Sequence, residues 1–166
     1  MTANRTRIVF AQLAVMAFLA LTANASLFAQ NAFYAQTTAA QSTYTSASVP
    51  ITGLMLTLPA SSTAYNVAIV TLNLPNLYLS GTASGGPLGA EVSVWVGTSA
   101  YPKAAGQISS EALTSGTSGR KPATIVVEIP LTSTTQIVTG EWAGIRGSTI
   151  DTDTFGSLSA ILVKVR

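Results

Sequence analysis

Hydrophobic and polar residues alternate, or form short apolar runs, along most of the chain from Val49 onward. Six segments of this kind are rich in Val, Ile, Leu and Thr. They predict strands at residues 51–59, 65–75, 90–97, 122–131, 135–145 and 157–165. Clusters of Gly, Ser, Thr and Pro separate these segments and predict turns. No segment keeps the 3.6-residue period of an amphipathic helix. The sequence therefore predicts an all-β domain, either a sandwich or a jelly roll.

The chain divides into three predicted parts. Residues 1–25 form a leader, residues 26–48 a flexible or irregular N-terminal arm, and residues 49–166 a single β-domain. The arm carries no charge and no clear period, and it is rich in Ala, Ser, Thr and Gln. No repeat of fixed length is visible, which argues against a propeller or a solenoid.

The leader has the layout of a secretory signal peptide. Arg5 and Arg7 precede an apolar stretch at residues 8–21, and the small residues Ala-Asn-Ala follow at 23–25. Cleavage after Ala25 is expected, with Ala29 as the second choice. The competing interpretation is an uncleaved anchor, which needs about 20 apolar residues to span a bilayer. We expect a secreted or periplasmic protein with no membrane attachment once the leader is removed.

Charge narrows the range of partners. The chain has 8 Lys and Arg residues against 6 Asp and Glu residues, a net charge of +2. Without the leader's two arginines, six basic residues face six acidic ones. A neutral chain argues against nucleic acid, where clustered Lys and Arg neutralise phosphates. The absence of His and Cys removes the commonest transition-metal ligands, two common nucleophile pairs and any disulfide.

Hydroxyl groups take the place of charges on the predicted strands. Only 8% of the residues are charged, whereas a typical soluble domain has about 25%. Ser and Thr far outnumber the charged residues from residue 26 onward. A neutral hydroxyl surface does little to prevent self-association. We therefore expect an oligomer.

The acidic residues give no specific sign of catalysis or of a metal. Asp151-Thr152-Asp153 is a D-x-D pair that could hold calcium or act as paired carboxylates, but a solvated loop between two strands is the favoured interpretation. Glu91, Glu111, Glu128 and Glu141 are dispersed, and nothing supports the two facing carboxylates of a glycosidase. We expect neither an enzyme nor a bound metal or cofactor.

Two arginines are more informative. Arg120 and Arg146 each lie beside a glycine. A guanidinium offers several fixed N–H donors and can bridge vicinal sugar hydroxyls or a carboxylate. The alternative is a surface arginine paired with Glu141 or Asp153, which contributes little to stability.

Two tryptophans fall in strand patterns. Trp95 and Trp142 could each stack on a sugar. A single Trp in an alternating strand is more often part of a core or an interface, and core is favoured here.

The C-terminal third resembles a known family. Residues 140–161 contain G-x-W-x-x-x-R-G-S, a short loop ending in Asp and a hydroxyl residue, an aromatic, and S-L-S-A-I. This skeleton resembles the TNF-like fucose-binding domain found at the N-terminus of a bacterial superlectin. S-G-R at 118–120, N-x-P-x-x-Y at 73–78 and the strand at 51–58 fall in the same order. The resemblance covers roughly residues 49–163.

The resemblance implies a TNF-like jelly-roll protomer in a homotrimer. It also implies calcium-independent recognition of fucosylated glycans at sites between neighbouring protomers. The implied sugar-binding residues are Arg120, Arg146, Ser118, Ser109, Asp153, Thr154 and Tyr78. Ser93 and Ser110 depart from the family's pattern because the family has Tyr at both positions. The loop at residues 80–88 is longer and richer in glycine than the family's.

A second function fits the same fold. Low charge, many hydroxyls and an uncharged arm are also typical of a structural or adhesive envelope subunit with no sugar site. The loss of two tyrosines favours this alternative, because aromatic contact area is lost with them. A fold by itself does not fix a function.

Overall fold

Short and long strands make up the computed structural model, which describes residues 31–109, 113–153 and 155–166. The predicted leader, Ser110 and Thr154 lie outside these residues. Residues 33–166 form one unit. Within the described residues, no helix is long and apolar enough to cross a membrane.

The strands follow one another along the chain with short connections. They are β1 (Ala32–Gln36), β2 (Gln41–Thr43), β3 (Val49–Leu58), β4 (Val67–Thr82), β5 (Gly89–Val96), β6 (Ser99–Ser109), β7 (Ser115–Thr117), β8 (Lys121–Pro130), β9 (Gln136–Ile145), β10 (Thr149–Thr152) and β11 (Ser157–Val163).

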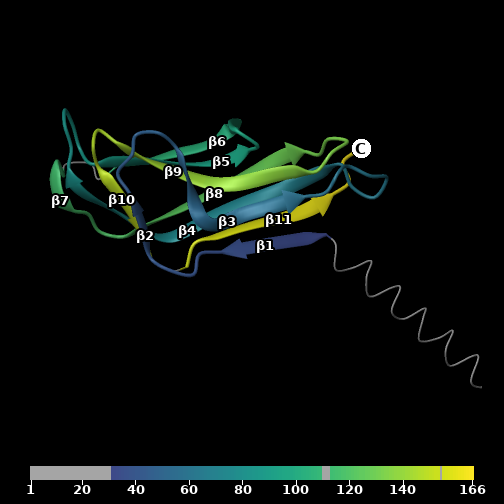
Figure 1. The fold of residues 1–166 in the computed structure, drawn as a ribbon, viewed down its shortest axis with the longest axis horizontal. Helices are drawn as coiled ribbons and strands as arrows, with labels where there is room; N and C mark the ends of the chain where they lie inside the picture. Colours follow the sequence, from purple (N-terminus) through teal and green to yellow (C-terminus); the bar gives the residue numbers. More distant parts are fainter. Residues whose placement is uncertain (1–30, 110–112, 154) are drawn as a thin grey trace, which may run out of the picture. The chain divides into compact units, whose positions relative to one another are not determined.

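Two antiparallel sheets form a sandwich (Figure 1). The larger sheet has the order β1-β11-β4-β10-β2, with β7 and β8 also paired to β4. The smaller sheet has the order β3-β9-β5-β6. The chain passes repeatedly from one sheet to the other, so neighbours in a sheet are mostly distant in sequence. The predicted all-β sandwich is confirmed.

The core lies between the two sheets and comes from the period-two pattern. In β4, Leu72, Leu74 and Leu79 alternate inward with polar residues outward, and in β5 Val92 and Val94 are also buried in the core. Burial of each such side chain contributes about 1.5–3 kcal/mol. The core is fully apolar on these faces, which explains how the sandwich holds together without disulfides.

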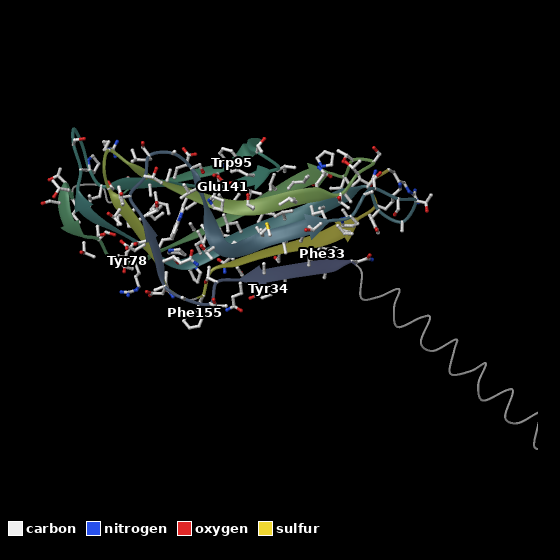
Figure 2. The ribbon with its side chains drawn as sticks, viewed as in Figure 1. Phe33, Tyr34, Tyr78, Trp95, Glu141 and Phe155 are labelled. Atoms are coloured by element: carbon white, nitrogen blue, oxygen red, sulfur yellow. The ribbon has the colours of Figure 1, made fainter. Side chains whose placement is uncertain are left out.

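The two tryptophans differ. Trp142 is 2% exposed and belongs to the core, as expected. Trp95 is half-buried on the other face of the smaller sheet, where its indole N–H donates to Ser93 Oγ at 2.9 Å. The core assignment is therefore wrong for Trp95. Figure 2 shows Trp95 with Glu141 on the side of the smaller sheet, and Tyr78 with Tyr34 on the side of the larger one.

The structure corrects the expectation for the N-terminal arm. The part of the arm that is described contains β1 and β2, which add two strands to the larger sheet. Phe33 and Ala35 of β1 pack against the core, while Tyr34 between them is exposed. Pairing with a distant strand therefore orders a segment whose own sequence has no strong period.

Three further strands were not expected from the pattern. β6 and β7 lie in segments of low β-propensity, and β10 lies within residues assigned to a turn. β4 also continues beyond Pro75 to Thr82, and its pairing with β8 shifts register between Leu74 and Leu77. A bulge of this kind lets a strand pass a proline without losing its partner.

The close approach of the two sheets at Gly140 gives a test of the packing. A Cβ at Gly140 would lie 2.9 Å from Leu72 Cδ1 and 3.4 Å from Leu54 Cβ. Gly140→Ala should therefore lower the free energy of unfolding by about 1–3 kcal/mol through overpacking, measured by urea denaturation. Gly106→Ala is the control, because its Cβ would meet only Ile125 Cδ1 at 3.8 Å. Equal stability of the two variants would contradict this packing.

Candidate functional site

Arg120 is held by two different groups. Its Nε donates to Asp153 Oδ2 at 2.7 Å and its Nη2 donates to Asp153 Oδ1 at 3.4 Å. Its Cζ lies 5.1 Å from the centroid of the Tyr78 ring. Charge-assisted hydrogen bonds fix the edge of the guanidinium, and the aromatic face adds a cation–π contact. These three residues, called here the Arg120 cluster, meet although they are far apart in sequence.

Each member of the Arg120 cluster is placed by a strand of the larger sheet. Tyr78 points outward from β4, because Leu77 and Leu79 on either side point into the core. In the register of β4 with β10, Tyr78 lies opposite Asp151. Asp153 follows directly after β10 ends at Thr152. The strand pairing thus brings the carboxylate to the tyrosine.

Ser118 anchors the backbone that leads into Arg120 to strand β4. Its hydroxyl accepts a hydrogen bond from the backbone N–H of Leu79 at 2.8 Å and donates to the carbonyl of Gly119 at 3.0 Å. Its own N–H donates to the carbonyl of Leu79 at 2.8 Å. The Ser118 hydroxyl is therefore engaged with the backbone, and it positions Arg120 beside Tyr78.

The Arg120–Asp153 pair changes the acidity of both groups. The hydrogen bond from Arg120 lowers the pKa of Asp153, and the same bond raises the pKa of Arg120. Because the folded-state pKa of Asp153 is depressed, the pair stabilises the fold above the unfolded-state pKa of about 3.9. That contribution is lost as the pH falls through the folded-state pKa. The carboxylate is ionised at neutral pH.

The D-x-D pair is divided between two environments. Asp151 lies within β10 rather than in a loop, and its Oδ2 accepts a hydrogen bond from the Ser80 hydroxyl at 2.8 Å. Asp153 forms a salt bridge with Arg120. Among the described residues, no three His, Cys, Asp or Glu side chains come together as a metal site would require. The expectation of a solvated loop is thus wrong for Asp151.

Arg146 lies in a second cluster. It occupies the turn between β9 and β10, and its Nε donates to the carbonyl of Pro87 at 2.9 Å. Its backbone carbonyl accepts from the N–H of Ser84 at 2.9 Å. The side chain of Arg146 and the β4–β5 connection at residues 83–88 are called here the Arg146 cluster.

The two clusters lie toward the same end of the sandwich and have no residue in common. Both are next to strands β7 and β10, at one end of the view in Figure 1. The contacts of the Arg120 side chain are with Asp153 and Tyr78, whereas the Arg146 side chain donates to Pro87. Ser109 lies between them, because it pairs with Gly89 beside Arg146 and its carbonyl accepts from Lys121 Nζ at 3.0 Å.

Aromatic side chains are distributed differently from the family's pattern. Ser93 is 1% exposed and bonded to Trp95, so it is not at the surface of either cluster. Phe155, two residues after Asp153, is 61% exposed, and Tyr44 beyond β2 is 79% exposed. The sequence reasoning named neither residue as part of the site, although Phe155 is the aromatic of the family skeleton. The sequence feature that could have identified them is an aromatic residue in a segment that otherwise lacks large apolar side chains.

The fold and these clusters define a two-sheet β-sandwich that carries a charge-paired arginine and a second, separate arginine at one end. The model of the family described as "Bc2l-C, N-terminal domain" matches residues 32–161. The chain belongs to this family. The TNF-like jelly-roll assignment is thereby confirmed, and the family indicates lectin-type carbohydrate binding. No curated protein matches the chain.

Solved structures with a similar arrangement of strands are distant in sequence. The TNF Eiger from S. frugiperda has a TM-score of 0.48 at 8% identity, over 82% of this chain and 94% of that one. Latent PorU from Porphyromonas gingivalis has a TM-score of 0.46 at 11% identity, over 82% of this chain and 13% of that one. Insecticidal delta-endotoxin Cry8Ea1 from Bacillus thuringiensis has a TM-score of 0.39 at 16% identity, over 74% of this chain and 19% of that one.

The Arg120–Asp153 pair predicts a specific change in titration. Arg120→Met removes the donors but keeps an apolar stem against Tyr78. The pKa of Asp153 should then rise, because the hydrogen bond that lowers it is lost, as followed by carboxyl ¹³C NMR against pH. Arg146→Asn is the matched control and should leave that titration unchanged. An Asp153 titration that is the same in Arg120→Met and in the unsubstituted protein would show that the pair does not form.

Proposed function

We propose that this protein is a secreted lectin that binds fucose-type glycans, without catalysis, at sites shared between neighbouring copies in a trimer. The observation that carries the proposal is the family match over residues 32–161 together with the two separate arginine clusters. Each cluster supplies half of a polar site. In the proposed trimer, Arg120 of one copy and Arg146 of a neighbouring copy would contact the same sugar.

The chemistry of the two halves suits a neutral sugar. In the Arg120 cluster, Asp153 accepts hydrogen bonds and the arginine donates them, so hydroxyl groups can both donate and accept there. The Arg146 cluster supplies donors. A site matched to hydroxyls rejects ligands that lack them, because an unpaired buried polar group is costly. Phe155 and Tyr78 offer apolar surface near Asp153 and Arg120.

The outer face of the larger sheet supports association between copies. Val126 and Ile161 are 62% and 57% exposed, and they lie on strands that flank β4 on either side. Thr71 of β4 lies opposite Val126, and Ile69 lies opposite Ile161. Tyr78 points from the same face of β4. Association through this face would therefore bring the Arg120 cluster to an interface.

Three identical sites on one trimer would bind weakly one at a time and strongly together. Linked sites gain affinity without any new contact, because the second binding event is intramolecular. This arrangement suits a surface that displays many glycans.

A fucosylated glycan array tests the binding proposal. Arg120→Met and Arg146→Asn should each weaken binding by about 10–100-fold, since a hydrogen bond to a charged group contributes about 1.5–3 kcal/mol. Lys164→Gln is the charge-matched control at an exposed position after β11, and it should bind normally. A folded oligomer that binds no glycan on the array would instead support the structural or adhesive subunit.

Oligomeric state tests the proposed interface. Val126→Glu and Ile161→Glu each place a charge on the outer face of the larger sheet and should dissociate the trimer, because an unpaired buried charge is strongly unfavourable. Ile137→Glu is the control, since Ile137 is 49% exposed on the smaller sheet. Multi-angle light scattering distinguishes trimer from monomer. A monomeric unsubstituted protein, or dissociation by Ile137→Glu alone, would contradict this interface.

A further inference from the structure

Arg146 has an unusual backbone. Its φ is 58°, and it is followed by Gly147 with φ 82°. The N–H of Ser148 donates to the carbonyl of Ile145 at 3.1 Å and closes the turn. Two successive residues with positive φ define a type I′ turn, in which Asn, Asp or Gly is preferred at the first position. A long cationic residue at that position is strained, and such strain concentrates at functional sites.

The connection between β4 and β5 is shaped to receive this side chain. A Cβ at Gly86 would lie 3.2 Å from Arg146 Nε and 3.5 Å from its Cζ. A Cβ at Gly89 would lie 3.0 Å from Arg146 Nη2. Both glycines therefore leave room that any other residue would take from the guanidinium. Gly85, next to Gly86, has nothing within 4 Å of its Cβ position.

Pro87, between the two glycines, supplies the acceptor. Its carbonyl takes the Nε–H of Arg146 at 2.9 Å, while the N–H of Ser84 binds the Arg146 carbonyl at 2.9 Å. The loop and the turn thus hold each other through both the backbone and the side chain of Arg146. The hydrogen bond to Pro87 engages Nε, Nη2 lies close to Gly89, and Arg146 as a whole is an exposed residue.

We propose that Gly86, Pro87 and Gly89 form a seat that fixes the Arg146 guanidinium, with its terminal N–H groups directed to a glycan oxygen. The three residues are positioning residues and need not touch the ligand. The seat lowers the rotamer entropy that a free arginine would lose on binding. This inference rests on the proposed function for its ligand, but the seat itself can be tested without one.

NMR of the arginine side chains provides that test. The Nε–H of Arg146, assigned by its loss in Arg146→Asn, should exchange with water at least tenfold more slowly than that of the C-terminal Arg166. Gly86→Ala and Gly89→Ala should abolish this protection. Gly85→Ala should retain it, although Gly85 has φ 75° and its substitution strains the backbone. Unprotected Nε–H in the unsubstituted protein, or protection that survives in both Gly86→Ala and Gly89→Ala, overturns the proposal.

Glycan affinity shows whether the seat serves binding. Gly89→Ala should weaken binding at least fivefold, and Gly85→Ala by less than twofold. Gly89→Ala should have no further effect in Arg146→Asn, because the side chain that it crowds is gone. An equal loss in both backgrounds would show that Gly89 acts elsewhere and would overturn the link to binding. If no glycan binds while the Nε–H is protected as expected, the proposed function fails and the seat remains.

Discussion

The pairing of β4 along both of its edges is the constraint on which the rest of the molecule depends. This strand of 16 residues pairs with β8 and β11 along one half and with β7 and β10 along the other. Buried backbone groups must find partners, so a strand this long needs neighbours along its whole length. Both halves contribute leucines to the core, and the second half also carries Tyr78 outward to the Arg120 cluster. Stability and the candidate site therefore share one strand.

The two arginines of the candidate site differ in how their positive charge is accommodated. The positive charge of Arg120 is offset by Asp153 within the same cluster, whereas Arg146 is held by a neutral carbonyl and by the shape of a loop. A carboxylate partner would compete for the donors that a ligand needs, and a carbonyl at Nε leaves the terminal nitrogens available. The two arginines therefore offer different hydrogen-bonding groups to a ligand. Arg120 belongs to a donor–acceptor pair with Asp153, whereas Arg146 offers donors alone.

The sequence pattern predicted the sandwich because its strands alternate or form short apolar runs, and Leu72, Leu74 and their neighbours in β4 show the alternation most clearly. It missed β1, β2 and β10 because their order comes from pairing with strands that are distant in sequence. The two arginines were found from their glycine neighbours and the family resemblance. For Arg120, the sequence left two interpretations open: a contact with a sugar, or an ion pair with an acidic residue such as Asp153. The seat around Arg146 was not foreseen, because neither a positive φ at an arginine nor the approach of another loop is visible in a local pattern.

A site divided between copies links ligand binding to assembly. In the proposed assembly, a glycan that contacts Arg120 of one copy and Arg146 of the next would bind the trimer and not the monomer. Whatever binds one state in preference stabilises that state by mass action. The coupling is reciprocal, so a trimer stabilised through Val126 and Ile161 would also bind glycan more tightly than a loosened one. The exposed apolar face and the polar end of the sandwich would then act as one thermodynamic unit, even though they share no side chain.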